Sequence, residues 1–373
     1  MNNQFYWMCL GVTLFATSCD RSKSGTSNSN MIQLSEKYDK TFWFQEGLAP
    51  VRRNNKWGFV DTNGVEVIPV QYENAWMFTE GLATVTVNNK HGFIDKTGKM
   101  VIPPVYDDAE PFSEGLGFVE SNKKMGFVNH NGDTIVPLKY DDCESQFANG
   151  FAAVKRGSMW GFVNREGRER ISLRYSWTQN FTDGLAAVED GRKFYYVDTA
   201  GRTVLDVKSD RRDKFSEGLA RVSMNDLFGY ITKAGTVAVE PQYDMAEDFS
   251  EGLAVVRKNG KYGAIDKQGT LVVPLKYDKM DLHFLGGHIP VSLNGKWGIV
   301  NLKGVEVITP DKYEWCGAAS EGLFPVQLNG KRGFVNAKGE IKIPFQYETV
   351  NKFSEGYAWA RHDSTWQLLK RPK

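Results

Sequence analysis

The sequence predicts an all-β protein made of about ten tandem copies of a unit 34 or 35 residues long. A phenylalanine returns at this spacing and opens a segment close to Phe-x-Glu-Gly-Leu-Ala in most copies, which indicates a repeat architecture. The 37 glycines and 13% aromatic residues suit short β-strands joined by tight turns. No copy shows helical periodicity over ten residues. The recurring phenylalanines are Phe44, Phe78, Phe112, Phe147, Phe181, Phe215, Phe249, Phe284 and Phe353, and Ala319 fills the one gap.

Each unit contains three short apolar runs that turn residues separate. The first strand is expected at 253–257 in the seventh copy and at the same place in the others, and the second at aromatic–Gly–aromatic runs such as 57–60. The second run ends in Asp or Asn with Gly three positions later, as at Asp61 and Gly64. This spacing predicts a type I turn that the Asp side chain holds. The third run, such as 66–68, is expected to end at a proline, which lacks a ladder donor.

Proline also falls inside the first strand, at Pro50, Pro290 and Pro325. An internal proline leaves no amide for a partner strand, so we expect this strand to be an edge or irregular strand. Three short strands cannot bury both faces of a unit, and neighbouring units must therefore stack to make the core.

The sequence is compatible with two arrangements of the stacked units. The chain begins with a third-strand segment at 32–34. It ends with a unit that has a first strand and a second strand, the latter at 366–369, but no third strand. Together these pieces would complete one unit of a closed propeller-like ring of about ten small blades. A unit of 34 residues is nevertheless short for a four-stranded blade, since propeller repeats run to about 40 residues or more. We therefore expect the β-meander repeats to stack as an open solenoid or superhelix, with the closed ring as the alternative.

The second run carries the pair Trp-Gly at 57–58, 160–161 and 297–298, with variants such as Tyr262-Gly263 and Arg332-Gly333. In these residues the chain resembles the bacterial WG-repeat family, also called KWG repeats, over about residues 38–373. The fifth copy departs most, because Phe194-Tyr195 replaces the pair and the later Pro and Tyr-Asp are lost. The last copy has Trp366-Gln367. The resemblance implies a repeat β fold and brings no catalytic residue with it.

The N-terminus has the features of a targeting segment. Residues 5–16 are mostly apolar, too few to span a bilayer but enough for the core of a signal peptide. The small residues Ala16, Thr17 and Ser18 precede Cys19, which resembles a bacterial lipobox; an ordinary signal peptide with an incidental cysteine is the alternative. We expect a signal peptide at 1–18, a lipidated Cys19 with a flexible Ser-, Asn- and Gly-rich tether at 19–31, and the repeat domain at 32–373.

The composition of the chain limits the classes of partner that it is expected to bind. A net charge of +1 argues against nucleic acid, which demands a concentrated basic face. No segment after residue 20 is apolar enough to cross a membrane, so the expected membrane contact is the N-terminal lipid alone. Cys143 and Cys316 occupy the same repeat position five units apart, beyond disulfide reach, and we interpret both as small packing residues.

The recurring polar residues look architectural. An acid precedes Gly in eight copies and is expected to brace a turn, because a catalytic pair would be singular. The Asp-x-x-Gly turns lack the alternating ligands of a calcium loop. We therefore predict no catalytic residue, no metal and no cofactor. The acids are Glu46, Glu80, Glu114, Asp183, Glu217, Glu251, Glu321 and Glu355.

Aromatic residues offer the better site candidates. The column that holds Trp57, Trp160, Tyr262, Trp297 and Trp366 also tolerates His, Met and Arg, which predicts a position packed on one side and wet on the other. Outside the consensus, three tryptophans follow a third strand in the loop before the next repeat. Loops on a rigid scaffold often bind ligands, and Trp is a common anchor. The ligand-contact candidates are Trp76, Trp177 and Trp315.

We interpret the chain as a lipid-anchored protein of the bacterial cell envelope, on its periplasmic or surface face, whose repeats act as a non-catalytic binding or scaffold module for a protein or a glycan. The alternative is a carbohydrate-active enzyme on a closed β-ring. That enzyme would need an irregular unit such as the fifth, whose 206–213 loop is more simply a solvated charge cluster.

Overall fold

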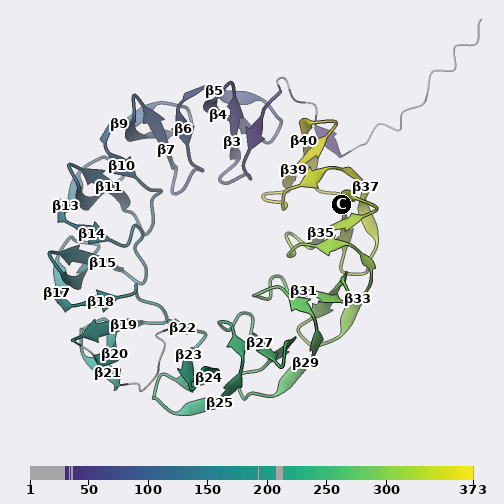
Figure 1. Cartoon of the computed structure of the whole chain (residues 1–373). Helices are drawn as coiled ribbons and strands as arrows, with labels where there is room; N and C mark the ends of the chain where they lie inside the picture. Colours follow the sequence, from purple (N-terminus) through teal and green to yellow (C-terminus); the bar gives the residue numbers. More distant parts are fainter. Residues whose placement is uncertain (1–29, 33, 35–36, 192, 207–212, 373) are drawn as a thin grey trace, which may run out of the picture.

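The computed structural model describes residues 30–32, 34, 37–191, 193–206 and 213–372. These residues form β-strands and no helix, arranged as ten four-stranded antiparallel sheets. The sheets follow one another around a closed ring (Figure 1). We number them as blades 1 to 10 in chain order, so that blade 1 begins with β2 and blade 10 with β38. The all-β tandem-repeat fold is thus confirmed.

In blades 1 to 9 a two-residue strand comes first and three longer strands follow in sequence order; in blade 10 the place of the third long strand is taken by the two-residue β1. The short strands are β2 (Lys40–Thr41), β6 (Asn74–Ala75), β10 (Asp108–Ala109), β14 (Asp142–Cys143), β18 (Trp177–Thr178), β22 (Phe215–Ser216), β26 (Met245–Ala246), β30 (Lys279–Met280), β34 (Trp315–Cys316) and β38 (Thr349–Val350). The first long strands are β3 (Leu48–Arg53), β7 (Leu82–Val87), β11 (Gly117–Ser121), β15 (Phe151–Arg156), β19 (Leu185–Asp190), β23 (Leu219–Met224), β27 (Ala254–Lys258), β31 (His288–Leu293), β35 (Leu323–Leu328) and β39 (Tyr357–His362).

The second and third long strands complete the sheet of each blade. The second long strands are β4 (Lys56–Asp61), β8 (Lys90–Asp95), β12 (Lys124–Val128), β16 (Met159–Asn164), β20 (Lys193–Asp198), β24 (Leu227–Thr232), β28 (Lys261–Ile265), β32 (Lys296–Asn301), β36 (Lys331–Asn336) and β40 (Thr365–Lys370). The third long strands are β5 (Glu66–Tyr72), β9 (Met100–Tyr106), β13 (Thr134–Tyr140), β17 (Glu169–Tyr175), β21 (Thr203–Asp206), β25 (Val237–Tyr243), β29 (Leu271–Tyr277), β33 (Glu306–Tyr313), β37 (Ile341–Tyr347) and, in blade 10, β1 (Met31–Ile32). The third long strands lie at the outer rim of the ring (Figure 1).

The turns follow from their residues. Asn54 and Asn55 both have positive φ (52° and 60°), which makes the β3–β4 connection a type I′ hairpin, the turn whose twist matches paired strands. After β4 the N–H of Gly64 donates to the Asp61 carbonyl (3.0 Å), and Asp61 Oδ1 accepts from the N–H of Asn63 and of Val65 (2.9 Å each). The predicted type I turn held by an Asp side chain is confirmed.

Two strand predictions need correction. β3 lies between β2 and β4 and is not an edge strand. Pro50 is tolerated there because it lies one residue past the end of β2, where only its carbonyl is used, as the acceptor of the Phe42 N–H (3.0 Å). The third strand also does not end at its proline: β5 runs on to Tyr72 through a bulge.

The ring closes through the split unit. Met31 pairs with Leu369 and Ile32 with Leu368, so that β1 supplies the third long strand of blade 10. The closed ring that the sequence offered as the alternative is therefore confirmed, and the favoured open solenoid is wrong. A repeat of 34 residues suffices for a blade because one of its four strands needs only two residues. β1 begins at Met31, one residue before the expected start of the repeat domain.

The recurring acids link neighbouring blades. Glu46 and Gly47 form the central pair of a type I′ turn (φ 55° and 85°) between the short strand and the first long strand. In eight junctions the acid accepts a hydrogen bond from a backbone N–H in the same turn of the next blade. Its place is therefore architectural, but the turn it holds belongs to its neighbour. The pairs are Glu46 with Gly81, Glu80 with Gly115, Glu114 with Gly150, Asp183 with Gly218, Glu217 with Gly252, Glu251 with Gly286 and Gly287, Glu321 with Gly356, and Glu355 with Glu46 and Gly47.

The hydrophobic core lies between the blades. Phe59 of blade 1 contacts Phe78 of blade 2 (ring centroids 4.9 Å apart), and both are fully buried. At the seam the same packing joins blade 10 to blade 1, where Phe44 stacks on Trp359 with centroids 6.1 Å apart. Each blade thus buries its faces against its neighbours, as the short unit predicts.

Candidate binding groove at blades 7 to 9

A groove of about 540 Å³ opens where blades 7, 8 and 9 meet. Its wall is built from the aromatic column of the second long strands and from the next short strand. The column residues Tyr262 and Trp297 are half-buried, as expected for a position packed on one side and wet on the other. The lining residues are Tyr262, Lys279, Met280, Asp281, Trp297, Trp315, Cys316, Gly317 and Ala318.

Trp315 owes its position to two neighbours. A Cβ on Gly317 would lie 2.8 Å from Trp315 Cη2, so glycine is required for the indole to lie against this backbone. The Arg332 guanidinium carbon lies 4.4 Å from the indole centroid, a cation–π contact. Arg332 Nη1 donates to Thr349 Oγ1 (3.1 Å) and Nε to Gln327 Oε1 (3.3 Å). The indole of Trp315 is therefore fixed in position by the protein itself, without a ligand.

The chemistry that the groove offers is recognition. Three aromatic rings supply apolar contact surface, and Lys279 and Asp281 supply charges of both signs. Burial raises the pKa of the Cys316 thiol well above its usual range, so this cysteine stays protonated and unreactive. Burial also raises the pKa of the Cys143 thiol. Both cysteines are free and pack in or against the hydrophobic clusters of their blades, as expected for packing residues.

The three tryptophans that the sequence singled out lie on different blades. Trp315 lines the groove. Trp177 is half-buried in blade 5, with its ring 6.5 Å from that of Phe194. Trp76 follows β6 in blade 2 and is 40% exposed. The fold does not bring them together, and ligand contact at each stays a prediction. Cys19, the expected lipidation site, lies outside the described residues, as do the signal peptide and all of the expected tether except residues 30 and 31.

A second groove, of about 400 Å³, lies at the seam between blades 10 and 1. Phe42 stacks on Trp57 with centroids 5.3 Å apart, and Lys352 Nζ lies 4.8 Å from the centroid of Trp43. Sequence reasoning missed Phe42 and Trp43. The signal that selected Trp76, an aromatic residue just before the repeat phenylalanine, is present at both. The lining residues are Lys40, Thr41, Phe42, Trp43, Asn351, Lys352 and Trp366.

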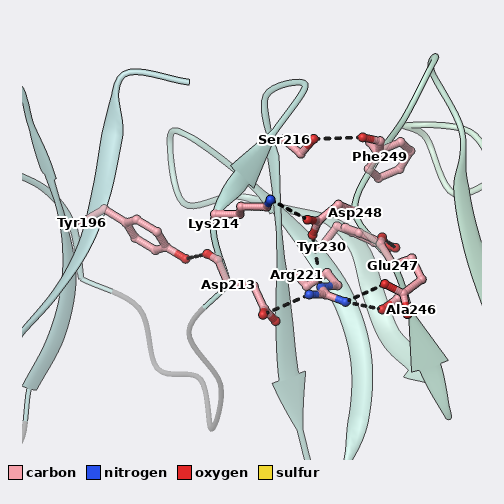
Figure 2. Close-up of polar contacts among 10 residues, drawn as sticks. All are labelled: Tyr196, Asp213, Lys214, Ser216, Arg221, Tyr230, Ala246, Glu247, Asp248 and Phe249. Carbon is pink, nitrogen blue, oxygen red and sulfur yellow. Dashed lines mark hydrogen bonds and ion pairs between the residues drawn. The ribbon is translucent and has the colours of Figure 1, made fainter. Parts of the chain in front are cut away.

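Asp213, the last residue of the irregular 206–213 loop, takes part in an ion-pair cluster (Figure 2). Arg221 occupies the position of Pro50 in blade 6 and is largely buried, and its guanidinium pairs with Asp213 (3.1 Å), Glu247 (3.4 Å) and Asp248 (3.4 Å). The Tyr196 hydroxyl donates to the Asp213 carbonyl (2.5 Å). These contacts tie the end of the irregular loop to blades 5, 6 and 7, which is a structural role. Residues 207–212 of that loop lie outside the described part.

Within the described part of the chain, no three His, Cys, Asp or Glu side chains are grouped to hold a metal ion. The same residues include no helix long and apolar enough to cross a membrane. The predictions of no metal and no cofactor remain predictions.

The fold and the groove define a repeat-built propeller of ten blades whose aromatic side chains line the grooves between blades. The family described as "WG containing repeat" matches the chain ten times, and the chain belongs to this family. The matched residues are 34–57, 57–90, 92–124, 125–159, 160–194, 196–228, 228–262, 262–297, 297–331 and 333–366.

Among solved structures, a eukaryotic initiation factor shares the fold at 12% identity, with a TM-score of 0.53 over 87% of this chain and 97% of the other. Kluyveromyces lactis Hsv2p is 11% identical over 71% of this chain and 97% of its own, with a TM-score of 0.36. PorZ, a bacterial surface component of the type-IX secretion system of Porphyromonas gingivalis, is 8% identical over 89% of this chain and 57% of its own, with a TM-score of 0.29. No curated protein matches the sequence.

Proposed function

We propose that the protein is a non-catalytic binding module of the bacterial cell envelope, which holds a glycan or a protein segment in the groove at blades 7 to 9. The observation that carries this proposal is the aromatic wall of Tyr262, Trp297 and Trp315 beside Lys279 and Asp281. Aromatic side chains with a few polar groups at the rim are typical of ligand sites.

The make-up of the groove supports binding over catalysis. Glycoside hydrolysis uses two carboxylates that flank the scissile bond. Of the described residues that line the groove, only Asp281 carries a carboxylate. Elsewhere the recurring acids are engaged with backbone amides of the next blade.

Alanine at Trp297 or Trp315 tests the groove. Each substitution removes a wall of the site, so affinity for a ligand found in a panel of oligosaccharides and peptides should fall by about tenfold or more, measured by titration calorimetry. Trp160→Ala is the matched control, because Trp160 holds the column position of Trp297 in blade 4, outside the groove. Equal losses in W160A and W297A would contradict the assignment, and cleavage of a bound glycan would overturn the non-catalytic part.

The envelope location rests on the sequence before the ring. We expect Cys19 to carry the lipid and the residues up to the ring to act as a spacer. In Cys19→Ala the protein should move from the membrane pellet to the soluble fraction and lose label from a radioactive fatty acid. Retention of C19A in the pellet would contradict lipid anchoring through this residue.

A further inference from the structure

The central turns of the blades form a series of carboxylate receptors. In blade 2 the N–H of Gly81 donates to Glu46 Oε2 (3.0 Å), and Lys96 Nζ lies 3.0 Å from the same oxygen. In blade 7 the N–H of Gly252 and Lys267 hold Glu217 in the same way, at 3.0 and 3.2 Å. A receptor therefore consists of turn amides and a cation, which together bind a carboxylate strongly.

The junction of blades 8 and 9 keeps the receptor and lacks the carboxylate. Gly286 stands where eight other copies have an acid. No described residue accepts a hydrogen bond from the backbone N–H of Glu321 or Gly322, and Gly322 is exposed. At the other junction without an acid, the Asn149 side chain occupies the place and its Nδ2 donates to the Phe181 carbonyl (3.1 Å).

A cation is also present beside this turn. Arg371 Nη2 lies 3.9 Å from the position that a Cβ would take on Gly322. Within the described part of the chain, the Arg371 side chain has no carboxylate partner. Two free amides and an unpaired guanidinium thus reproduce the composition of the occupied receptors.

The receptor follows the aromatic groove closely in the chain of blade 9. Ala318 lines the groove, and its neighbour Ala319 lies 3.9 Å from the position of a Cβ on Gly286. We propose that the Glu321–Gly322 turn and Arg371 bind the carboxylate of a uronic acid in a glycan whose neighbouring sugar rings lie on Trp297 and Trp315. This proposal rests on the function proposed above. A glycan fits better than a peptide because several aromatic side chains in one groove wall can pack against the apolar C–H faces of successive sugar rings.

The test uses trigalacturonic acid and its methyl ester, which carries no charge. The acid should bind the wild-type protein at least about tenfold more tightly than the ester, because charge-assisted hydrogen bonds are lost in the ester. Gly286→Glu places a carboxylate in the receptor, as the other copies do, and should abolish that difference and raise the melting temperature. Glu fits here because Gly286 has φ 60°, close to the 55° of Glu46.

Gly286→Gln is the matched control: it has the same shape without the charge, so it leaves Arg371 unneutralised and should reduce the preference for the acid less than Gly286→Glu does. Arg371→Gln should weaken binding of the acid and leave the ester unchanged. Equal binding of acid and ester, or a preference that survives in G286E, would overturn the inference. If W297A still abolished binding in that case, the groove itself would stand. Binding of a peptide through its free C-terminal carboxylate, with no binding of trigalacturonic acid, would overturn the choice of a glycan.

Discussion

At the scale of single residues, the glycine of the Trp-Gly pair is explained by a close backbone approach. Trp57 pairs with Tyr72 and Phe59 with Ile68, so the third long strand carries two extra residues opposite Gly58. A Cβ on Gly263, the same position in blade 7, would lie 2.5 Å from the Val273 carbonyl oxygen. In blade 5, where tyrosine replaces glycine, the strands pair without this bulge. Glycine and the bulged segment therefore occur together.

Gly263→Ala should destabilise the protein by roughly 1–3 kcal/mol, because the methyl group must displace backbone rather than a flexible side chain. Urea unfolding measures the loss. Gln367→Ala, at the same position in blade 10, is the control and should change stability by about 0.5 kcal/mol or less. A loss in G263A no larger than in Q367A would contradict the role of the close approach.

Residue patterns found part of the candidate site. Trp315 was visible because it departs from the consensus, and Trp297 because its column tolerates polar residues. The parts played by Gly317, Arg332 and Gly286 could not be read in advance, because each depends on a side chain or turn of a neighbouring strand or blade.

At the scale of the strand and the turn, most third long strands are followed by an acid, and at Asp278 this acid joins two blades. Asp278 Oδ2 accepts from the Asn294 N–H in the hairpin turn of blade 8 (2.7 Å), and Oδ1 from Lys261 Nζ in blade 7 (2.6 Å). The hydrogen bond from Lys261, and then that from the Asn294 amide, lower the pKa of Asp278. The ionised form is therefore favoured by folding.

Asp278→Asn should lower the melting temperature at pH 7, and the deficit should shrink on acidification. A folded-state pKa below the unfolded value contributes stability above the ordinary Asp pKa of about 4, and this contribution is lost as the pH falls through the folded value. Thermal melts of both proteins from pH 7 to pH 3 measure the effect. A deficit that stays constant over this range would exclude the ionised carboxylate as its cause.

Strands and turns were predicted well where their cause is local. The Asp-x-x-Gly turns and the aromatic–Gly strands depend on residues a few positions apart. The two-residue strand such as β6 has no pattern of its own, since two residues show no alternation, and without it the first long strand looked like an edge.

At the scale of the whole molecule, the ends of the chain close the ring with the contacts used elsewhere. Besides the β1–β40 pairing, Ser354 Oγ donates to the Phe44 carbonyl (2.6 Å), as Ser250 Oγ does to Phe284 within the chain (2.8 Å). Blade 10 differs from the other blades because β1, which takes the place of its third long strand, is not joined to β40 by a turn of the chain.

A disulfide at the seam should therefore form and stabilise the ring. Met31 and Leu369 are directly opposed in an antiparallel pair, within reach of a disulfide. In Met31→Cys/Leu369→Cys the oxidised protein should gain up to about 4–5 kcal/mol over the reduced one, because the bond closes nearly the whole chain. Denaturant unfolding with and without reductant measures the gain. An open solenoid would keep these residues apart, and failure of the bond to form would contradict closure.

The sequence by itself determined the repeat, its family, most strands and the bracing turns, because these follow from residues close together in the chain. Only the tertiary structure decided between solenoid and ring, since closure depends on the angle between blades, which packing across every junction sets together. It also assembled the candidate groove. Tyr262, Trp297 and Trp315 belong to different strands, and only the stacking of blades 7 to 9 brings them to one place.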